Sequence, residues 1–484
     1  MRSIASAIRM QTRTRIALVA TLLALATLTP GTAASAEAVT VWPESPDIIV
    51  VYIDDVPPLD GRLWTRRRTP YIRRHIIDRG MEFRNAVGES PLCCPGRANL
   101  LSGLHTHNNG VTRNDAALFD PRVSMASELR GAGYHTVWLG KYLNFFASLR
   151  GYRRLRHEAP WDVFRPYSGR NHGYLYRPVG AKWSLRPKVH QMRLLQRHTR
   201  AALRNAPTHE PLFAILSTYS GHLPNTPLAE FRGSSRCSGV GRWKPSNYGR
   251  ASARGKPGYV RRLAARRAWA VPRAGYPLTR LCEDMPGVDQ LVGIVVEEQR
   301  ARGRLANTVL VLTSDNGMAY GEHGIITKQV PYAVRVPLFV AWPAGLGTRR
   351  RVSRFPTSNI DLAPTFCEIP GCEMGPYRSG QTRADGISLV PALRGRPPRR
   401  DALLTVMLSR DRPPGRPVWT SVTTYASSPL GRWRFVRYRN GERELYDLRR
   451  DPGERVNLAG QRRHADVQRR LERRLARLLR EGRR

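Results

Sequence analysis

Residues 46–55 read Pro-Asp-Ile-Ile-Val-Val-Tyr-Ile-Asp-Asp, and this stretch decides the fold. Its apolar run at 48–53 is nearly continuous, which is typical of a strand buried on both faces of a parallel sheet. Asp54 and Asp55 follow where that strand ends. Ligands gather beyond the carboxyl ends of strands in open α/β sheets, so these acids indicate a metal site or a catalytic pair, with a solvated turn as the alternative.

The same arrangement recurs along the chain. Three further apolar runs each end in polar residues: 135–139 before Lys141, 212–216 before Ser220-Gly221-His222, and 308–313 before Asp315 and Asn316. Helical patterns at 69–79 and 288–302 alternate with these strands, and 336–342 adds another strand. This alternation predicts an α/β fold, with a mainly parallel sheet covered by helices on both faces.

Four of these polar residues share one chemistry. Asp54, Asp55, Asp315 and Asn316 are hard oxygen donors, and no spacing of Cys or His residues indicates zinc. Oxygen ligands of this kind suit calcium or magnesium. The sequence therefore predicts a site for Ca²⁺, with Mg²⁺ as the alternative.

A second stretch, residues 92–103, reads Leu-Cys-Cys-Pro-Gly-Arg-Ala-Asn-Leu-Leu-Ser-Gly. Pro95 suits the first turn of a helix because its missing N–H costs nothing there, so Cys93 is expected just ahead of a helix N-terminus. Arg97 follows four residues later, which adds a guanidinium to the unpaired backbone N–H groups. The stretch predicts an anion site. The alternative interpretation is a buried vicinal cysteine pair or half of a disulfide.

The pattern Cys93-x-Pro95-x-Arg97, followed by Leu-Ser-Gly at 101–103, resembles the signature of the formylglycine-dependent sulfatases. The resemblance implies that a formylglycine-generating enzyme converts Cys93 to formylglycine during maturation. In that family the aldehyde is hydrated, one hydroxyl attacks sulfur, and the other then expels sulfate. Gly96 departs from the more usual Ser of the signature.

The resemblance also implies roles for residues elsewhere. The implied metal ligands are Asp54, Asp55, Cys93, Asp315 and Asn316, and the implied sulfate-holding residues are Arg97, Lys141, His222 and Lys328. In this scheme His222 is the candidate proton donor to the leaving alcohol, and a bound divalent ion polarises a sulfuryl oxygen. The chain contains only six Lys, so finding two at these positions is informative, although either alone could be a surface residue.

Some positions point to a branch of the family, and others depart from it. Gly-Lys-Tyr-Leu-Asn at 140–144 and the Cys-Cys-Pro order resemble the glucosamine-6-sulfatase branch, which acts on heparan and keratan sulfates. Leu143 stands where many sulfatases have His, and Ala333 replaces the usual Glu after Tyr332. The resemblance spans about 46–460 and implies an alkaline-phosphatase-like domain followed by a small C-terminal α+β domain.

The ends of the chain complete the predicted organisation. An Arg-rich start, an apolar run at 16–28 and small residues up to 36 have the order of a secretory signal peptide, with an uncleaved anchor as the alternative. We expect a secreted protein without stable membrane insertion. Its catalytic domain spans 37–400, with an insertion at about 225–277, and its C-terminal domain spans 401–484 and ends in a basic helix.

Export permits disulfides, and two pairings are candidates. Cys367 and Cys372 are close enough in sequence to staple a turn, while Cys237 and Cys282 would close a basic loop region.

The charge of the chain is strongly positive, with 80 Lys and Arg against 37 Asp and Glu. Such a field attracts sulfated polysaccharides, nucleic acids and anionic surfaces alike, and the dominance of Arg over Lys is also what codon bias would produce. We expect a secreted sulfatase acting on a sulfated sugar or glycosaminoglycan, with no specific nucleic-acid partner. The rival hypotheses are a phosphonate or phosphate ester hydrolase of the same superfamily and a non-catalytic polyanion-binding protein.

Overall fold

The computed structural model describes residues 45–146, 160–168, 172–175, 184–249, 255–265, 271–377, 380–409 and 418–482. All of them belong to one compact unit, Trp42–Arg484. The predicted leader, residues 1–36, lies outside the described residues. Within the described part, no helix combines the length and the apolar character needed to cross a membrane.

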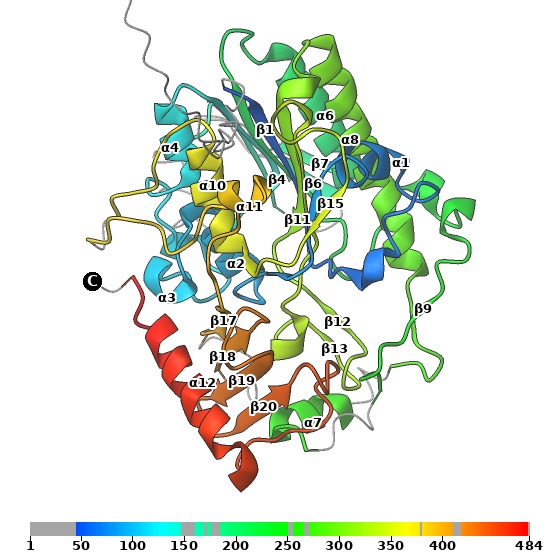
Figure 1. Ribbon diagram of the computed structural model, residues 1–484. Coiled ribbons are helices and arrows are strands. Elements are labelled where there is room, and N and C mark those ends of the chain that lie inside the picture. Colours follow the sequence, from blue (N-terminus) through cyan, green and yellow to red (C-terminus); the bar gives the residue numbers. More distant parts are fainter. Residues whose placement is uncertain are drawn as a thin grey trace, which may run out of the picture. The chain divides into compact units, whose positions relative to one another are not determined.

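A ten-stranded sheet forms the centre of the described part (Figure 1). Its strands, in order from edge to edge, are β15 (Arg351–Ser353), β2 (Met81–Phe83), β14 (Leu338–Ala341), β11 (Thr308–Ser314), β1 (Asp47–Ile53), β8 (Leu212–Ser217), β4 (His135–Lys141), β5 (Val163–Ser168), β6 (His172–Leu175) and β7 (Ser184–His190). The five strands from β11 to β5 are parallel to one another. Antiparallel pairing begins on either side of them, at β14 and at β6. The predicted mainly parallel sheet is therefore confirmed for the centre of the fold.

Strand β1 shows why this sheet is covered on both faces. Its even-numbered side chains at 48, 50 and 52 enter one apolar cluster, and its odd-numbered side chains at 49, 51 and 53 enter another. Successive side chains of a strand point to opposite faces, so a continuous apolar run requires a layer of helices on each side. Helices α2, α4 and α10 contribute to the first cluster, and α6 and α8 contribute to the second.

The helices of the described residues have the following bounds: α1 Pro70–Ile72, α2 Cys93–Ser102, α3 Thr106–Asn109, α4 Met125–Gly131, α6 Gln191–Asn205, α7 Gly258–Ala265, α8 Thr279–Ala301, α9 Pro343–Leu346, α10 Leu362–Glu368, α11 Val390–Leu393 and α12 Ala465–Leu478. Helix α8 begins nine residues before the predicted 288–302. The sequence pattern did not reveal its first half, because this half contains Pro286 and buries acidic side chains that interrupt the apolar periodicity. The helix predicted at 69–79 is divided into α1 and the π-helical turn Arg73–Ile77.

The insertion predicted at 225–277 carries short elements of its own. They are two 3₁₀ turns, Ala229–Phe231 and Ser235–Cys237, the pair β9 (Arg242–Trp243) and β10 (Tyr276–Pro277), and helix α7. A disulfide between Cys237 and Cys282 fastens the insertion to α8, which confirms that pairing. The other pairing is wrong, since Cys367 and Cys372 are free thiols. The Cys372 amide donates to the Cys367 carbonyl at 2.9 Å, so the backbone closes this turn without a disulfide.

We predict that the disulfide contributes measurably to stability. Its half-cystines are 45 residues apart, and a cross-link closing a loop of this size stabilises a fold by about 2–4 kcal/mol, chiefly through the unfolded chain. The double variant Cys237→Ala/Cys282→Ala should lose about that free energy in urea unfolding. Reductant should lower the unfolding midpoint of the wild type and leave that of the double variant unchanged. An equal effect of reductant on both proteins would contradict the assignment.

A second sheet of four antiparallel strands follows near the C-terminus (Figure 1). Its strands, in spatial order, are β17 (Ala402–Met407), β18 (Trp419–Thr424), β19 (Trp433–Tyr438) and β20 (Arg443–Asp447). Helix α12 covers one face with Leu471, Leu475 and Leu478. The other face packs against α7 and residues 330–334 of the larger part. The strands predicted at 432–436 and 444–448 and the C-terminal helix are confirmed.

Candidate active site

Four neighbouring strands end side by side at one edge of the large sheet. The register pairs Ile53 at the end of β1 with Ser314 of β11, and Tyr52 of β1 with Ser217 of β8. It also pairs Ser217 with Gly140 of β4. Because these strands are parallel, the residues at their carboxyl ends emerge together: Asp54 and Asp55 after β1, Asp315 and Asn316 after β11, Ser217 at the end of β8, and Lys141 at the end of β4.

Helix α2 brings Cys93 to this edge. Cys93 is the first residue of the helix, after an extended Leu92, and not a residue ahead of it as predicted. Close approach of the helix depends on Gly96, since a Cβ at that position would lie 2.5 Å from the carbonyl oxygen of Asp315. The departure from the usual Ser therefore has a packing reason here.

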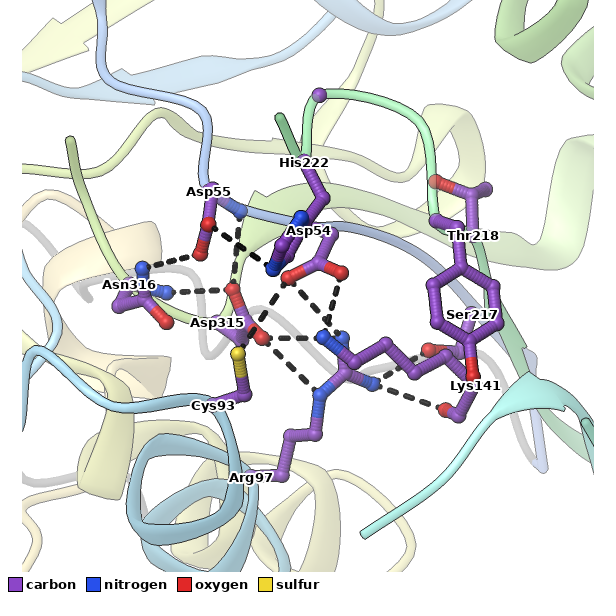
Figure 2. A network of polar contacts seen from close by, with 12 residues as sticks. Asp54, Asp55, Cys93, Arg97, Lys141, Ser217, Thr218, His222, Asp315 and Asn316 are labelled. Carbon is purple, nitrogen blue, oxygen red and sulfur yellow. Dashed lines mark hydrogen bonds and ion pairs between the residues drawn. The ribbon is translucent and has the colours of Figure 1, made fainter. Parts of the chain in front are cut away.

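The predicted metal ligands meet in one buried cluster (Figure 2). Ligand atoms of Asp54, Asp55, Cys93 and Asp315 all lie within 4.8 Å of one another. Asn316 joins them, because its Nδ2 donates to Asp55 Oδ1 at 2.7 Å. Asp55 itself has a positive φ of 58°, a strained conformation for a non-glycine residue that turns its carboxylate toward the cluster.

The donor set fits a hard divalent cation. The Oδ1 atom of Asn316 is buried and has no hydrogen-bond donor within the described part of the chain, so it is free to coordinate. Three carboxylates and an amide oxygen are ligands that Ca²⁺ and Mg²⁺ prefer. Asp54, Asp55, Asp315 and Asn316 would hold the ion, with position 93 beside it.

Three cationic side chains, all predicted from the sequence, balance the carboxylates. Arg97 donates to Asp315 Oδ2 through Nε at 3.0 Å, and to Ser217 Oγ through Nη1 at 2.6 Å. Lys141 Nζ lies 2.5 Å from Asp54 Oδ2. Lys328 Nζ lies 2.6 Å from Asp55 Oδ1 and 2.8 Å from Cys93 Sγ. A divalent ion added to this balanced set leaves an excess of positive charge, which favours an anionic substrate group.

Burial and these cations set the protonation of the cluster. Burial acts to raise the pKa of Asp315, but Arg97, Lys141 and Lys328 outweigh it and lower that pKa to about 2. Burial raises the pKa of the Cys93 thiol to about 11, although Lys141 and Lys328 act in the opposite direction. Asp315 is therefore ionised at neutral pH, whereas Cys93 in its unconverted form is a neutral thiol and a weak nucleophile.

His222 approaches the cluster from the loop after β8. Its Nδ1 lies 2.6 Å from the Leu223 carbonyl oxygen, which can only accept a hydrogen bond, so Nδ1 carries a hydrogen. Its Nε2 lies 3.6 Å from Asp55 Oδ2, and the side chain is about one-fifth exposed. Nε2 is thus the ring nitrogen that faces the metal-ligand cluster and can transfer a proton there.

The structure adds residues that the sequence analysis did not single out. Ser217 accepts from Arg97, and Arg97 also lies over the Tyr52 ring at 4.9 Å. Lys141 lies 5.4 Å from the centre of the Tyr219 ring. Asp284 on α8 accepts from the Gly221 amide at 2.8 Å and so holds the loop that carries His222. Ser217 and Tyr52 lie at the ends of strands that the sequence pattern predicted. No sequence pattern pointed to Asp284, because its partner Gly221 is distant in the chain.

Comparisons with known proteins show which family this chain resembles. The family model described as Sulfatase matches residues 46–371, and the model described as N-sulphoglucosamine sulphohydrolase, C-terminal, matches residues 321–481. The chain is 28% identical over 373 residues to the extracellular sulfatase SULF-1 homolog of Drosophila melanogaster, and 26% identical over 383 residues to human N-acetylglucosamine-6-sulfatase. Each match covers 72% of this chain, but only 31% of the fly protein and 64% of the human protein, less than two-thirds of either.

Solved structures share the fold. The structure of BT4656 in complex with its substrate D-glucosamine-2-N,6-O-disulfate superposes with a TM-score of 0.70 at 21% identity, covering 91% of this chain and 99% of that one. The phosphonate monoester hydrolase SpPMH from Silicibacter pomeroyi gives 0.68 at 21% identity, covering 91% and 96%. At these identities the likeness concerns the fold. The family model, by contrast, extends over more than half of the 484 residues, from β1 to beyond α10, and the chain therefore belongs to the sulfatase family.

Proposed function

We propose that this protein is a secreted sulfatase that hydrolyses sulfate esters of sugars, with glucosamine sulfates as the favoured class. The observation that carries the proposal is the position of Cys93, whose sulfur lies among three buried carboxylates and two lysines at the carboxyl edge of the sheet. Similar proteins support glucosamine sulfates as the substrate class. They include N-acetylglucosamine-6-sulfatases and a protein whose structure was solved with a glucosamine disulfate as its substrate.

In the proposed reaction the side chains divide the work. Formylglycine at position 93 would supply, as its hydrate, the hydroxyl that attacks sulfur and the second hydroxyl that lets sulfate leave. A cation held by Asp54, Asp55, Asp315 and Asn316 would supply Lewis-acid polarisation of a sulfuryl oxygen. Arg97, Lys141 and Lys328 hold the sulfate oxygens and stabilise negative charge as the sulfur–oxygen bond to the sugar breaks. In its imidazolium form, His222 gives the Nε2 proton to the departing sugar oxygen and keeps the Nδ1 hydrogen that it donates to the Leu223 carbonyl.

Maturation and export belong to the same proposal. Cys93 is only 2% exposed, so a formylglycine-generating enzyme would have to act before the fold closes over it. The leader at 1–36 and the Cys237–Cys282 disulfide favour export to an oxidising compartment. We assign catalysis to residues 37–400 and a supporting role to residues 401–484.

Conversion of Cys93 is tested by mass spectrometry of the tryptic peptide 85–97 from the native host. We expect the mass of an aldehyde in place of the thiol, together with turnover of an aryl sulfate and of a sulfated glucosamine. A thiol in every molecule would contradict the proposal and favour a polyanion-binding protein. Faster cleavage of a phosphodiester than of any sulfate ester would favour a phosphonate or phosphate ester hydrolase.

The cation is tested by chelation. Treatment with EGTA followed by desalting should remove one Ca²⁺ per chain, abolish turnover and lower the thermal midpoint, because an ion that binds only the folded state stabilises it. Adding Ca²⁺ should restore both quantities, and metal analysis gives the stoichiometry. Full activity in protein shown to be free of divalent metal would contradict the assignment of Asp54, Asp55, Asp315 and Asn316.

A further inference from the structure

The segment 328–332, here named the Lys328 segment, connects the site to the C-terminal sheet. At one end, Lys328 contacts Asp55 and Cys93. At the other end, Tyr332 turns away from the site toward β20. Residues 328–330 form neither helix nor strand, since β13 (Ile326–Thr327) ends before them and the 3₁₀ turn Pro331–Ala333 follows. The position of Lys328 therefore depends on what holds this segment from outside.

Three strands of the C-terminal sheet each contribute a hydrogen bond to the Lys328 segment. Trp419 of β18 donates through Nε1 to the Gln329 carbonyl at 3.4 Å. Arg434 of β19 donates through Nη1 to the Pro331 carbonyl at 3.3 Å. Glu444 of β20 accepts from the Tyr332 hydroxyl at 2.5 Å. The C-terminal sheet thus holds the segment through hydrogen bonds to two backbone carbonyl groups and one side chain.

A buried lysine also contacts both Glu444 and Tyr332. Lys256, from the insertion, has a fully buried side chain and lies 3.3 Å from Glu444 Oε2. Its Nζ also donates to the Tyr446 hydroxyl at 2.6 Å and lies 4.3 Å from the centre of the Tyr332 ring. A buried charge is costly unless it is paired and hydrogen-bonded, so a network of this kind permits few arrangements of its members. Glu444, held by Lys256 and its other partners, therefore gives Tyr332 a fixed hydrogen-bond acceptor.

We propose that the C-terminal sheet positions Lys328 for catalysis, with Glu444 as the main positioning residue acting through Tyr332. The inference rests on the proposed function in so far as it concerns turnover. Trp419 and Arg434 support the same segment through its backbone. The sheet then acts on catalysis only through the segment that carries Lys328, and Trp419, Arg434 and Glu444 lie outside the metal-ligand cluster.

A matched pair of substitutions tests this role. Tyr332→Phe and Tyr438→Phe each remove one hydroxyl that donates to Glu444, but only Tyr332 belongs to the Lys328 segment. We expect Tyr332→Phe to lower kcat/KM about tenfold, within the range of coupling between contacting residues. Tyr438→Phe should stay within twofold of the wild type. In a Lys328→Ala background, Tyr332→Phe should change kcat/KM by less than twofold, because the group it positions is gone.

A second measurement is independent of turnover. The chain has six Lys, so NMR of the ¹³C-labelled ε-carbons can resolve them individually. Both substitutions should shift the Lys256 signal, since both remove a partner of Glu444, but only Tyr332→Phe should shift the Lys328 signal. Unchanged Lys328 in Tyr332→Phe, or equal effects of both variants on it, would overturn the positioning role.

The two proposals fail differently. An inactive wild-type enzyme, or full activity of Lys328→Ala, would count against the proposed function, and the NMR comparison would still decide whether the sheet positions Lys328. An active wild type, an impaired Lys328→Ala and an additive effect of Tyr332→Phe would overturn only the inference made here.

Discussion

Cys93→Ala is expected to lower turnover by at least about 10⁴-fold, because it removes the residue that we propose becomes the nucleophile, while the proposed metal ligands and the cationic side chains remain. The side chain is 2% exposed and small, so the protein should fold and keep its thermal midpoint within a few degrees. The measurement is kcat with an aryl sulfate on protein whose unfolding curve has been recorded.

The neighbouring cysteine offers a matched control. Cys94 is fully buried and packs in the apolar cluster on the α2 side of the sheet, and its sulfur is not among the atoms of the metal-ligand cluster. Cys94→Ala removes the same atom from the next residue of the same helix, so kcat should remain within a few-fold of the wild type. Activity retained in Cys93→Ala, or lost equally in both variants, would contradict the role of position 93.

Asp315→Asn is expected to lower turnover by on the order of 10³-fold, because it weakens the cation site and removes a charge that orients Arg97. The conservative variant is preferable to Asp315→Ala, which leaves the buried Arg97 without its nearest carboxylate. Breaking a buried ion pair in that way costs about 3–5 kcal/mol of stability. Loss of activity in that variant could then result from unfolding as well as from loss of the metal. The measurements are bound Ca²⁺ per chain, kcat and the unfolding midpoint.

Asp289 provides the control for this prediction. It is a buried carboxylate on α8 that accepts from the Ile72 amide at 2.9 Å and is not a member of the metal-ligand cluster, and an Asn can make the same bond. Asp289→Asn should keep one Ca²⁺ and full turnover. A metal content near one per chain in Asp315→Asn would exclude Asp315 as a necessary ligand.

The predicted site residues are brought together because most of them follow the ends of strands. Asp54, Asp315 and Lys141 stand at strand ends that a parallel sheet must align, so a local pattern was sufficient to predict their meeting. Cys93 with Arg97 was found by its motif. Asp284 was missed, because a carboxylate near Pro286 only interrupts the apolar pattern of a helix. Its role is visible only in the folded structure, where it accepts a hydrogen bond from the Gly221 amide.

The sequence by itself determined the α/β architecture, the family, and the residues that gather at the sheet edge. These follow from short-range features, namely apolar runs, the polar residues that end them and one cysteine motif. Only the tertiary structure decided which cysteines pair, why Gly96 must be small, and how β18, β19 and β20 hold the Lys328 segment. Such contacts join residues from 45 to more than 200 positions apart, and no local pattern encodes them, because packing selects the partners only when the whole chain has folded.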